Sequence, residues 1–183
     1  MHITAKTGLL AAALGLFFVA GNSSATIVPV EQNSNAVNYC QAFTPGVSNT
    51  LRNRVVGVEN TGNAKLNVAC NFDATWTAGG EAPSDLDVYF SNTSTEDITV
   101  SCSLLTGYQG DADSYVSTKS VVVPAGATSD DGIDLYWSSE DNPEPESSDL
   151  GSYLIGINCS LPHGGVINDI YLDQNIDNGS TPV

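Results

Sequence analysis

Apolar and polar residues alternate one for one along three cysteine-containing segments of this chain, at residues 66–72, 98–104 and 153–161. Successive side chains of a β-strand point to opposite faces, so such a segment presents one apolar face and one polar face. In each of the three segments the cysteine falls on the apolar side. The pattern therefore predicts strands that cover a core with one face only and carry their cysteines inward.

Five further segments are predicted to be strands, at residues 54–60, 86–92, 115–123, 132–137 and 165–173. Turn-forming runs such as Asn60-Thr61-Gly62-Asn63 and Pro124-Ala125-Gly126 separate them. No segment that follows the N-terminal region has a helical stripe of apolar residues. About eight short strands without helices predict an all-β fold, an antiparallel two-sheet sandwich or jelly roll. A closed barrel is the alternative.

The chain has four cysteines, Cys40, Cys70, Cys102 and Cys159. Zinc sites need closely spaced cysteine pairs, and no C-x-x-C motif occurs here, so two disulfides are expected instead. The phrases V-S-C-S-L around Cys102 and I-N-C-S-L around Cys159 echo one another. Matching strands with inward cysteines predict the pairing Cys102–Cys159, which leaves Cys40–Cys70 as the second disulfide.

The N-terminus predicts an export signal. An apolar run follows Lys6 and extends from Gly8 to Ala20, which is short of the roughly 20 residues that a membrane-spanning helix needs. Ser23 and Ala25 fit the small-residue rule for cleavage after Ala25. We therefore expect residues 1–25 to be a signal peptide, the mature protein to be secreted or periplasmic, and no membrane insertion after cleavage.

The remaining chain is short enough for one domain, expected at residues 26–173. Residues 138–150 read SSEDNPEPESSDL and are expected to form an exposed acidic loop. Residues 174–183 are polar and without periodicity, so a frayed tail is expected there.

The charge of the chain is strongly negative, with 21 acidic against five basic residues and a net charge of −16. Such a field repels phosphate backbones and anionic lipid surfaces, which excludes nucleic acid as a partner. It attracts cations, and it also serves as solubilising charge in salty surroundings. Both interpretations of the charge stay open.

Three cysteine phrases, V-A-C-N-F (68–72), V-S-C-S-L-L (100–105) and I-N-C-S-L-P (157–162), follow an upstream Cys40 and the strand Gly57-Val58-Glu59-Asn60. In this order the chain resembles a loose group of exported bacterial four-cysteine β-sandwich proteins, over roughly residues 37–173. The resemblance implies the fold and export, and it assigns no function.

Catalytic machinery is sparse in the sequence, and we expect no enzyme. His163, in the turn before Gly164 and Gly165, is the one histidine after the signal segment, and neither G-x-S-x-G nor S-x-x-K occurs. Cysteine catalysis needs a free thiolate, and all four cysteines are expected to form disulfides. A pair of carboxylates acting on a glycosidic bond stays chemically open because acids are plentiful.

Two acidic clusters are candidate calcium sites. Asp111 and Asp113 are two residues apart in a loop, and Asp130, Asp131 and Asp134 lie at the start of a predicted strand. Calcium favours such hard oxygen ligands, although neither cluster completes the twelve-residue calcium loop. The alternative is that these are solvated turn acids that cap backbone groups.

Aromatic side chains are the candidate ligand-binding residues, because a flat ring covers the apolar face of a sugar. Trp76 is placed at a strand end, and Tyr136 is on the face opposite Trp137, which is expected in the core. For Trp76 core packing is the favoured interpretation, and a place at the rim of a binding site is the alternative. Tyr108, Tyr136 and Tyr171 are the expected exposed rings.

These features rank three functions. The first is a secreted module that binds a glycan or a surface protein, with calcium as its one candidate cofactor. The second is a structural or assembly protein of a matrix, coat or appendage, which associates through sheet edges or faces. The third is a carboxylate-dependent hydrolase. The sequence does not determine the oligomeric state.

Overall fold

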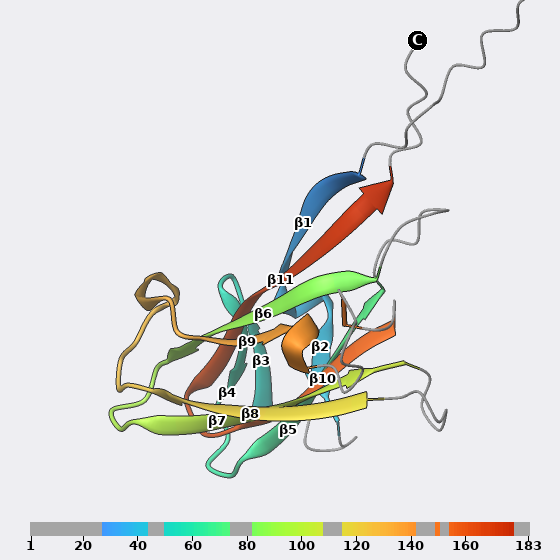
Figure 1. Cartoon of the computed structure of the whole chain (residues 1–183). Coiled ribbons are helices and arrows are strands. Elements are labelled where there is room, and N and C mark those ends of the chain that lie inside the picture. Colours follow the sequence, from blue (N-terminus) through green and yellow to red (C-terminus); the bar gives the residue numbers. More distant parts are fainter. Residues whose placement is uncertain are drawn as a thin grey trace, which may run out of the picture.

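The computed structural model describes residues 27–43, 50–73, 82–107, 115–141, 149–150 and 154–177. Within these ranges the chain forms eleven β-strands connected by loops and single turns of 3-10 helix (Figure 1). The strands are β1 (Ile27–Asn35), β2 (Cys40–Ala42), β3 (Leu51–Arg54), β4 (Gly57–Asn60), β5 (Leu66–Asp73), β6 (Pro83–Asn92), β7 (Ile98–Thr106), β8 (Tyr115–Val123), β9 (Asp134–Ser138), β10 (Leu154–Leu161) and β11 (Gly165–Asp177). The 3-10 turns are η1 (Ala36–Asn38), η3 (Ser129–Asp131) and η4 (Ser139–Asp141). The expected signal peptide lies outside the described residues.

The strands form two antiparallel sheets, which confirms the predicted fold class. Sheet A has the order β3-β4-β11-β6-β9, and β1 pairs with β11 beyond the end of β4. Sheet B has the order β2-β5-β10-β7-β8. No helix in the described part of the chain is long and apolar enough to cross a membrane.

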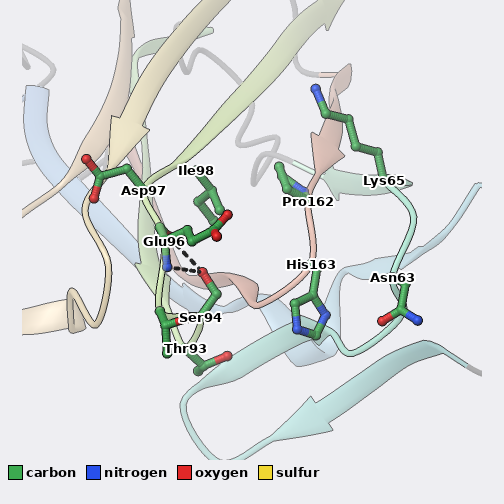
Figure 2. A pocket seen from close by; sticks show the side chains of 10 residues that line it. Asn63, Lys65, Thr93, Ser94, Glu96, Asp97, Ile98, Pro162 and His163 are labelled. Carbon is green, nitrogen blue, oxygen red and sulfur yellow. Dashed lines mark hydrogen bonds between the residues drawn. The ribbon is translucent and has the colours of Figure 1, made fainter.

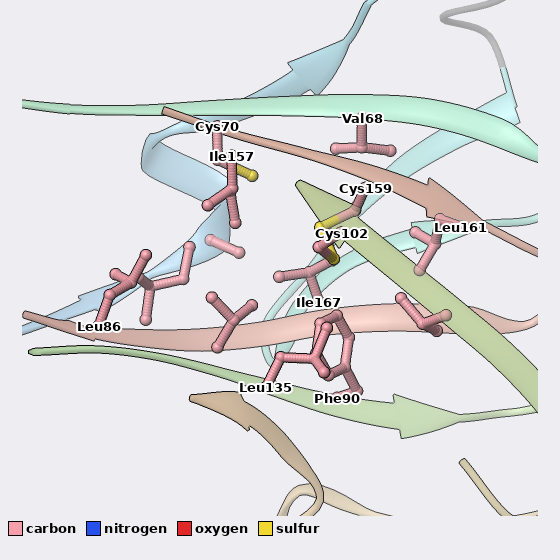
Figure 3. Packing of buried hydrophobic residues seen from close by; sticks show 14 of the residues in the cluster. Val68, Cys70, Leu86, Phe90, Cys102, Leu135, Ile157, Cys159, Leu161 and Ile167 are labelled. Atoms are coloured by element: carbon pink, nitrogen blue, oxygen red, sulfur yellow. A yellow bond between two sulfur atoms is a disulfide. The ribbon is translucent and has the colours of Figure 1, made fainter. Parts of the chain in front are cut away.

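The core lies between the two sheets and is built from the apolar side of each alternating strand (Figure 3). Val68 and Ile157 face it from sheet B, and Phe90 and Ile167 face it from sheet A, each with an exposed fraction of 2% or less. Trp137 is fully buried, which confirms its expected place in the core. Burying each such side chain contributes about 1.5–3 kcal/mol relative to leaving it exposed.

Both predicted disulfides are present, and both join neighbouring strands of sheet B. Cys102 on β7 lies directly opposite Cys159 on β10, and Cys40 on β2 lies directly opposite Cys70 on β5. The two Cα atoms of each pair are 4.0 Å apart. The structure describes no free cysteine. Because disulfides persist in oxidising compartments, the pair indicates an extracytoplasmic environment.

Residues 54–60 form a hairpin rather than the single strand predicted from their sequence. β3 ends at Arg54 and β4 begins at Gly57, and the turn between them leaves Val55 97% exposed. Gly57 has φ +142°, and a Cβ atom there would collide with the carbonyl oxygen of Ile167 on β11. The strand β4 can therefore approach β11 only through a glycine.

Other strand ends differ from the prediction for identifiable reasons. Gly132 does not begin β9, because it adopts a left-handed conformation that ends the turn η3. β11 continues past residue 173 to Asp177, because β1 pairs with it along its whole second half. Leu150, expected in an exposed loop, is 1% exposed, and its N–H donates to the carbonyl of Pro83 (2.7 Å).

Candidate functional site

In sheet A every second side chain of a strand faces away from the core, and many of these outward side chains are polar. On β6, Leu86 and Val88 are fully buried while the residues between and beside them are partly exposed. The outward side chains of the adjacent strands form one surface, which we name the tyrosine–carboxylate face. Its members are Asp85, Asp87 and Tyr89 on β6, Asp134, Tyr136 and Ser138 on β9, Asp169, Tyr171 and Asp173 on β11, and Glu31, Asn33 and Asn35 on β1.

The strand register arranges this face in rows that cross the sheet. The central row runs Tyr136, Asp87, Tyr171, Asn33, each residue directly opposite the next. One flanking row runs Ser138, Asp85, Asp173, Glu31. On the other side Asp134 lies opposite Tyr89, and Asp169 lies opposite Asn35. Two tyrosines thus flank Asp87, with carboxylates on both adjoining rows.

Contacts between these side chains fix the tyrosine rings. Tyr89 and Tyr171 meet edge to face, with ring centroids 5.3 Å apart and an interplanar angle of 70°. The Tyr136 hydroxyl donates a hydrogen bond to Asp85 Oδ1, and the residue remains 45% exposed. Strand-borne rings held in this way offer a binding surface that is already formed.

Burial, neighbouring acids and a hydrogen bond shift several pKa values on this face. Burial is the largest cause that raises the pKa of Asp87 from 3.8 to about 6, followed by the charge of Asp134 and then those of Asp173 and Asp85. Burial also raises the pKa of Asp173 and of Asp169. The hydrogen bond to Asp85 raises the pKa of Tyr136 to about 12. None of the twelve positions of the face carries a basic residue.

A hollow of about 380 Å³ borders the face on the side of its Glu31–Asp173 row. Glu31 on β1, Ser84 on β6 and Asp173 on β11 contribute to its wall. Polar side chains of the face therefore continue into a depression that can hold part of a ligand.

The structure places the sequence-predicted site residues in three groups. Tyr136 and Asp134 belong to the tyrosine–carboxylate face. Asp130 and Asp131 lie in η3, where Asp131 Oδ2 accepts hydrogen bonds from Thr128 N (2.7 Å) and Thr128 Oγ1 (3.1 Å). Trp76, Tyr108, Asp111 and Asp113 lie outside the described residues. Among described residues, no three His, Cys, Asp or Glu side chains are grouped so that they could hold a metal ion.

Sequence reasoning missed most of this face. It did not select Asp85, Asp87, Tyr89 or Asp173, and it noted Tyr171 only as an exposed ring. A signal was present, because D-L-D-V-Y (85–89), D-L-Y (134–136) and D-I-Y-L-D (169–173) all alternate Asp or Tyr with one apolar residue. Three strands with this alternation place the same residue types on one face once the strands are adjacent.

A second hollow, of about 630 Å³, lies among loops at one end of the sandwich (Figure 2). Glu96 and Asp97 from the β6–β7 loop lie on one side, and His163 and Lys65 lie on the other, with Pro162 and Ile98 between them. His163 is exposed, as expected, and its Nδ1 is 3.1 Å from the carbonyl oxygen of Gly62. This hollow has charged walls, and no Phe, Tyr or Trp is among the described residues that line it.

Glu59 on β4 lies close to these loops as a nearly buried carboxylate. Arg54 Nε is 2.6 Å from Glu59 Oε2, and Thr93 Oγ1 donates to Glu59 Oε1 (2.8 Å). Burial opposes its ionisation, but the hydrogen bonds from Thr93 and Arg54 outweigh burial and lower the pKa of Glu59. The side chain thus ties the β3–β4 hairpin to the β6–β7 loop and has a structural role.

No family model and no curated protein matches the sequence. Among solved structures, TmCBM61 in complex with β-1,4-galactotriose aligns with 79% of this chain and 84% of its own chain, at 9% identity and a TM-score of 0.31. PfGH50B aligns with 86% of this chain at 11% identity and a TM-score of 0.37, and this chain spans 24% of its length. Alignments with TM-scores this low carry no argument about the ligand of this protein.

Proposed function

We propose that this protein is a secreted binding module that recognises a glycan through the tyrosine–carboxylate face. The observation that supports the proposal is the central row of that face, in which Tyr136 and Tyr171 flank Asp87 on adjacent strands. Rings and hydrogen-bonding groups alternate there on a rigid sheet, and Tyr136 is substantially open to solvent.

Sugar chemistry matches both residue types. The C–H face of a pyranose ring packs on an aromatic ring, and its hydroxyl groups donate hydrogen bonds to carboxylates, which form the stronger charge-assisted type. Within a row, side chains of neighbouring strands are about 4.8 Å apart, so an extended oligosaccharide lying along the row meets ring and carboxylate in turn.

The charge of the face restricts the class of glycan. Six acids and no bases occupy its positions, so a glycan with uronic acid or sulfate groups is repelled. Neutral glycans, or glycans that carry free amino groups, fit the face. An amino group would also gain from the carboxylates beside Asp87.

Export and calcium belong to the same proposal. A signal peptide at residues 1–25 accounts for export, and the two disulfides are consistent with the oxidising compartment that it leads to. The calcium part rests on two acidic clusters, Asp111 with Asp113 and Asp130 with Asp131 and Asp134. Asp134 also belongs to the tyrosine–carboxylate face, but sugar binding by that face needs no metal.

Glycan-array binding by the secreted protein, followed by titration of the best oligosaccharide, tests the proposal. Tyr136→Ala and Tyr171→Ala are each expected to weaken binding by at least about tenfold, equivalent to about 1.4 kcal/mol. Tyr136→Phe keeps the ring and is expected to retain most of the affinity. Tyr115→Ala on sheet B is the matched control and is expected to bind normally, and the oligosaccharide should be recovered intact.

Two results would contradict the proposal. One is a glycan ligand whose affinity is unchanged in both tyrosine variants, because the site would then lie elsewhere. The other is the absence of any ligand among neutral and amino-bearing glycans.

A further inference from the structure

The outer face of sheet B carries no charged residue over a wide area. Within this area the outward positions are the odd-numbered residues of 67–71 on β5 and of 99–105 on β7, and the even-numbered residues of 156–160 on β10 and of 116–122 on β8. The area ends before Asp73, the last residue of β5. Every one of these positions holds Ser, Thr, Asn, Gly, Ala, Val or Leu. We name this surface the neutral face. It is unusual in a chain with a net charge of −16.

Hydroxyl and amide groups form continuous rows across the neutral face. Ser103 lies between Asn158 and Thr118, and its Oγ is 2.7 Å from Thr118 Oγ1. In the next row Ser120 Oγ donates to Ser101 Oγ (2.9 Å). These groups both donate and accept hydrogen bonds, so a surface built from them is complementary to a copy of itself.

The one basic residue of β8 is held away from this face. Lys119 has inward parity, and its Nζ lies 2.8 Å from Asp141 Oδ2 and donates to the carbonyl of Tyr136 on β9 (2.8 Å). The outward side of β8 carries Val116 and Val122 beside its two hydroxyl residues, and these valines are 58% and 57% exposed. Apolar contacts are thus available at both ends of the edge strand.

The face also contains a hollow of about 250 Å³, where Gly156 has no side chain. Asn71 on β5 and Leu105 on β7 lie opposite Gly156 and help to line it. A small side chain from an opposing surface, such as the exposed Val116 of a second copy, has the size and polarity to enter it.

We propose that the neutral face is a self-association surface, through which two copies of this chain pack face to face. Two proteins of this charge repel each other wherever their acids meet, and the repulsion is smallest where the neutral faces meet. A two-fold pair needs a self-complementary patch, which the hydroxyl rows supply. The tyrosine–carboxylate face, on the opposite sheet, stays open on both copies.

The area of the face is sufficient for a reversible dimer. The four strands lie about 4.8 Å apart and contribute five to seven residues of about 3.3 Å each, which gives a plane of about 380 Å² per copy. Side chains make the accessible area larger, so a pair buries about 1,000 Å² in total, the lower bound for a specific interface. The overall charge opposes association, so screening by salt is expected to strengthen the dimer.

Analytical ultracentrifugation of the secreted protein, over a concentration series at low and high sodium chloride, tests this proposal. We expect a monomer–dimer equilibrium whose dissociation constant falls several-fold as salt increases. Thr118→Glu adds a charge to the centre of the face, twice per dimer, and is expected to raise the dissociation constant at least tenfold. Ser129→Glu, in the exposed turn η3, adds the same charge elsewhere and is expected to have little effect.

Three outcomes would overturn self-association. A monomer at every concentration and salt would do so, and so would equal losses in Thr118→Glu and Ser129→Glu, because then net charge alone governs association. Co-sedimentation of a monomer with an insoluble neutral polysaccharide, lost in Thr118→Glu, would assign the face to a polysaccharide surface instead. Tyr136→Ala is expected to dimerise normally, so failure here and failure of the proposed glycan site are distinguishable.

Discussion

Asp87 illustrates how one residue on the candidate site couples binding chemistry to stability. Its pKa is raised to about 6 in the folded protein, first by burial and then by neighbouring carboxylates. The folded state therefore holds the proton more tightly than the unfolded chain does. The contribution of this group to the free energy of unfolding is fully present at pH values below its ordinary pKa of 3.8. It is lost as the pH rises through about 6.

Removing that charge is expected to stabilise the protein at neutral pH. Asp87 is partly exposed, so solvent screening reduces the full effect of its shift. We expect Asp87→Asn to add about 1 kcal/mol at pH 7.5 and about a third of that at pH 4.5. Urea unfolding of wild type and variant at both values measures this. Asp130→Asn, on an exposed turn, is the control, and a loss of stability in Asp87→Asn at both values would refute the argument.

Alternation along each strand correctly indicated which single residues point outward, but it did not indicate which residues lie beside them on neighbouring strands. Tyr136 was predicted as a ligand-binding residue because it is on the face opposite Trp137, and Asp134 as a metal ligand because it belongs to an acidic cluster. The structure places both on the side opposite buried Leu135 and Trp137. That Asp87 lies between Tyr136 and Tyr171 depends on pairing between strands that are far apart in the chain. Register of this kind is set by the packed core, and alternation within one strand does not determine it.

At the scale of elements, alternation was a reliable signal where a strand has one buried face. β7 and β10 follow the pattern, and they are neighbours in sheet B as their echoing sequences suggested. β1 and β2 were not predicted. β1 is mostly exposed and rich in polar residues, and β2 is only Cys40–Ala42, so neither has an apolar face long enough to recognise.

The two disulfides make different elements depend on a covalent bond. Cys102–Cys159 joins two central strands and closes the longer loop, with a sequence separation of 57 against 30 for Cys40–Cys70. We expect Cys102→Ala/Cys159→Ala to lower the free energy of unfolding by about 3–5 kcal/mol and Cys40→Ala/Cys70→Ala by about 2–4 kcal/mol.

Denaturant unfolding and amide hydrogen exchange compare these two double variants. The Cys40/Cys70 variant is expected to show faster exchange in the short edge strand β2 while sheet B remains protected elsewhere. A larger loss of stability in the Cys40/Cys70 variant than in the Cys102/Cys159 variant would contradict this ranking.

At the scale of the whole molecule, the two sheets present opposite kinds of surface. The outer face of sheet A concentrates carboxylates around tyrosines, whereas the neutral face on the outer side of sheet B carries no charged residue at its outward positions. The strands of the two sheets are interleaved along the chain, so composition and net charge average over both faces and conceal the difference. Under the two proposals, the glycan surface and the self-association surface lie on different sheets and do not compete.

Salt and calcium are expected to act on this charged molecule in distinguishable ways. Sodium chloride screens the net charge of −16 and is expected to raise the melting temperature gradually, without saturation at low concentration. Calcium bound at the loop acids adds RT ln(1 + [L]/Kd), about 2.7 kcal/mol at a hundredfold excess over Kd. The calcium hypothesis therefore predicts a saturable rise beyond sodium at equal ionic strength, lost in chelator and in Asp111→Asn or Asp130→Asn.

Thermal melts at two protein concentrations complete that experiment, because a dimer stabilised by salt also raises the melting temperature. The contribution of association depends on protein concentration, whereas screening within one molecule and calcium binding do not. A rise that is equal in sodium and calcium removes calcium from the proposed function. A rise in calcium that survives in both aspartate variants would place the ion away from these loops.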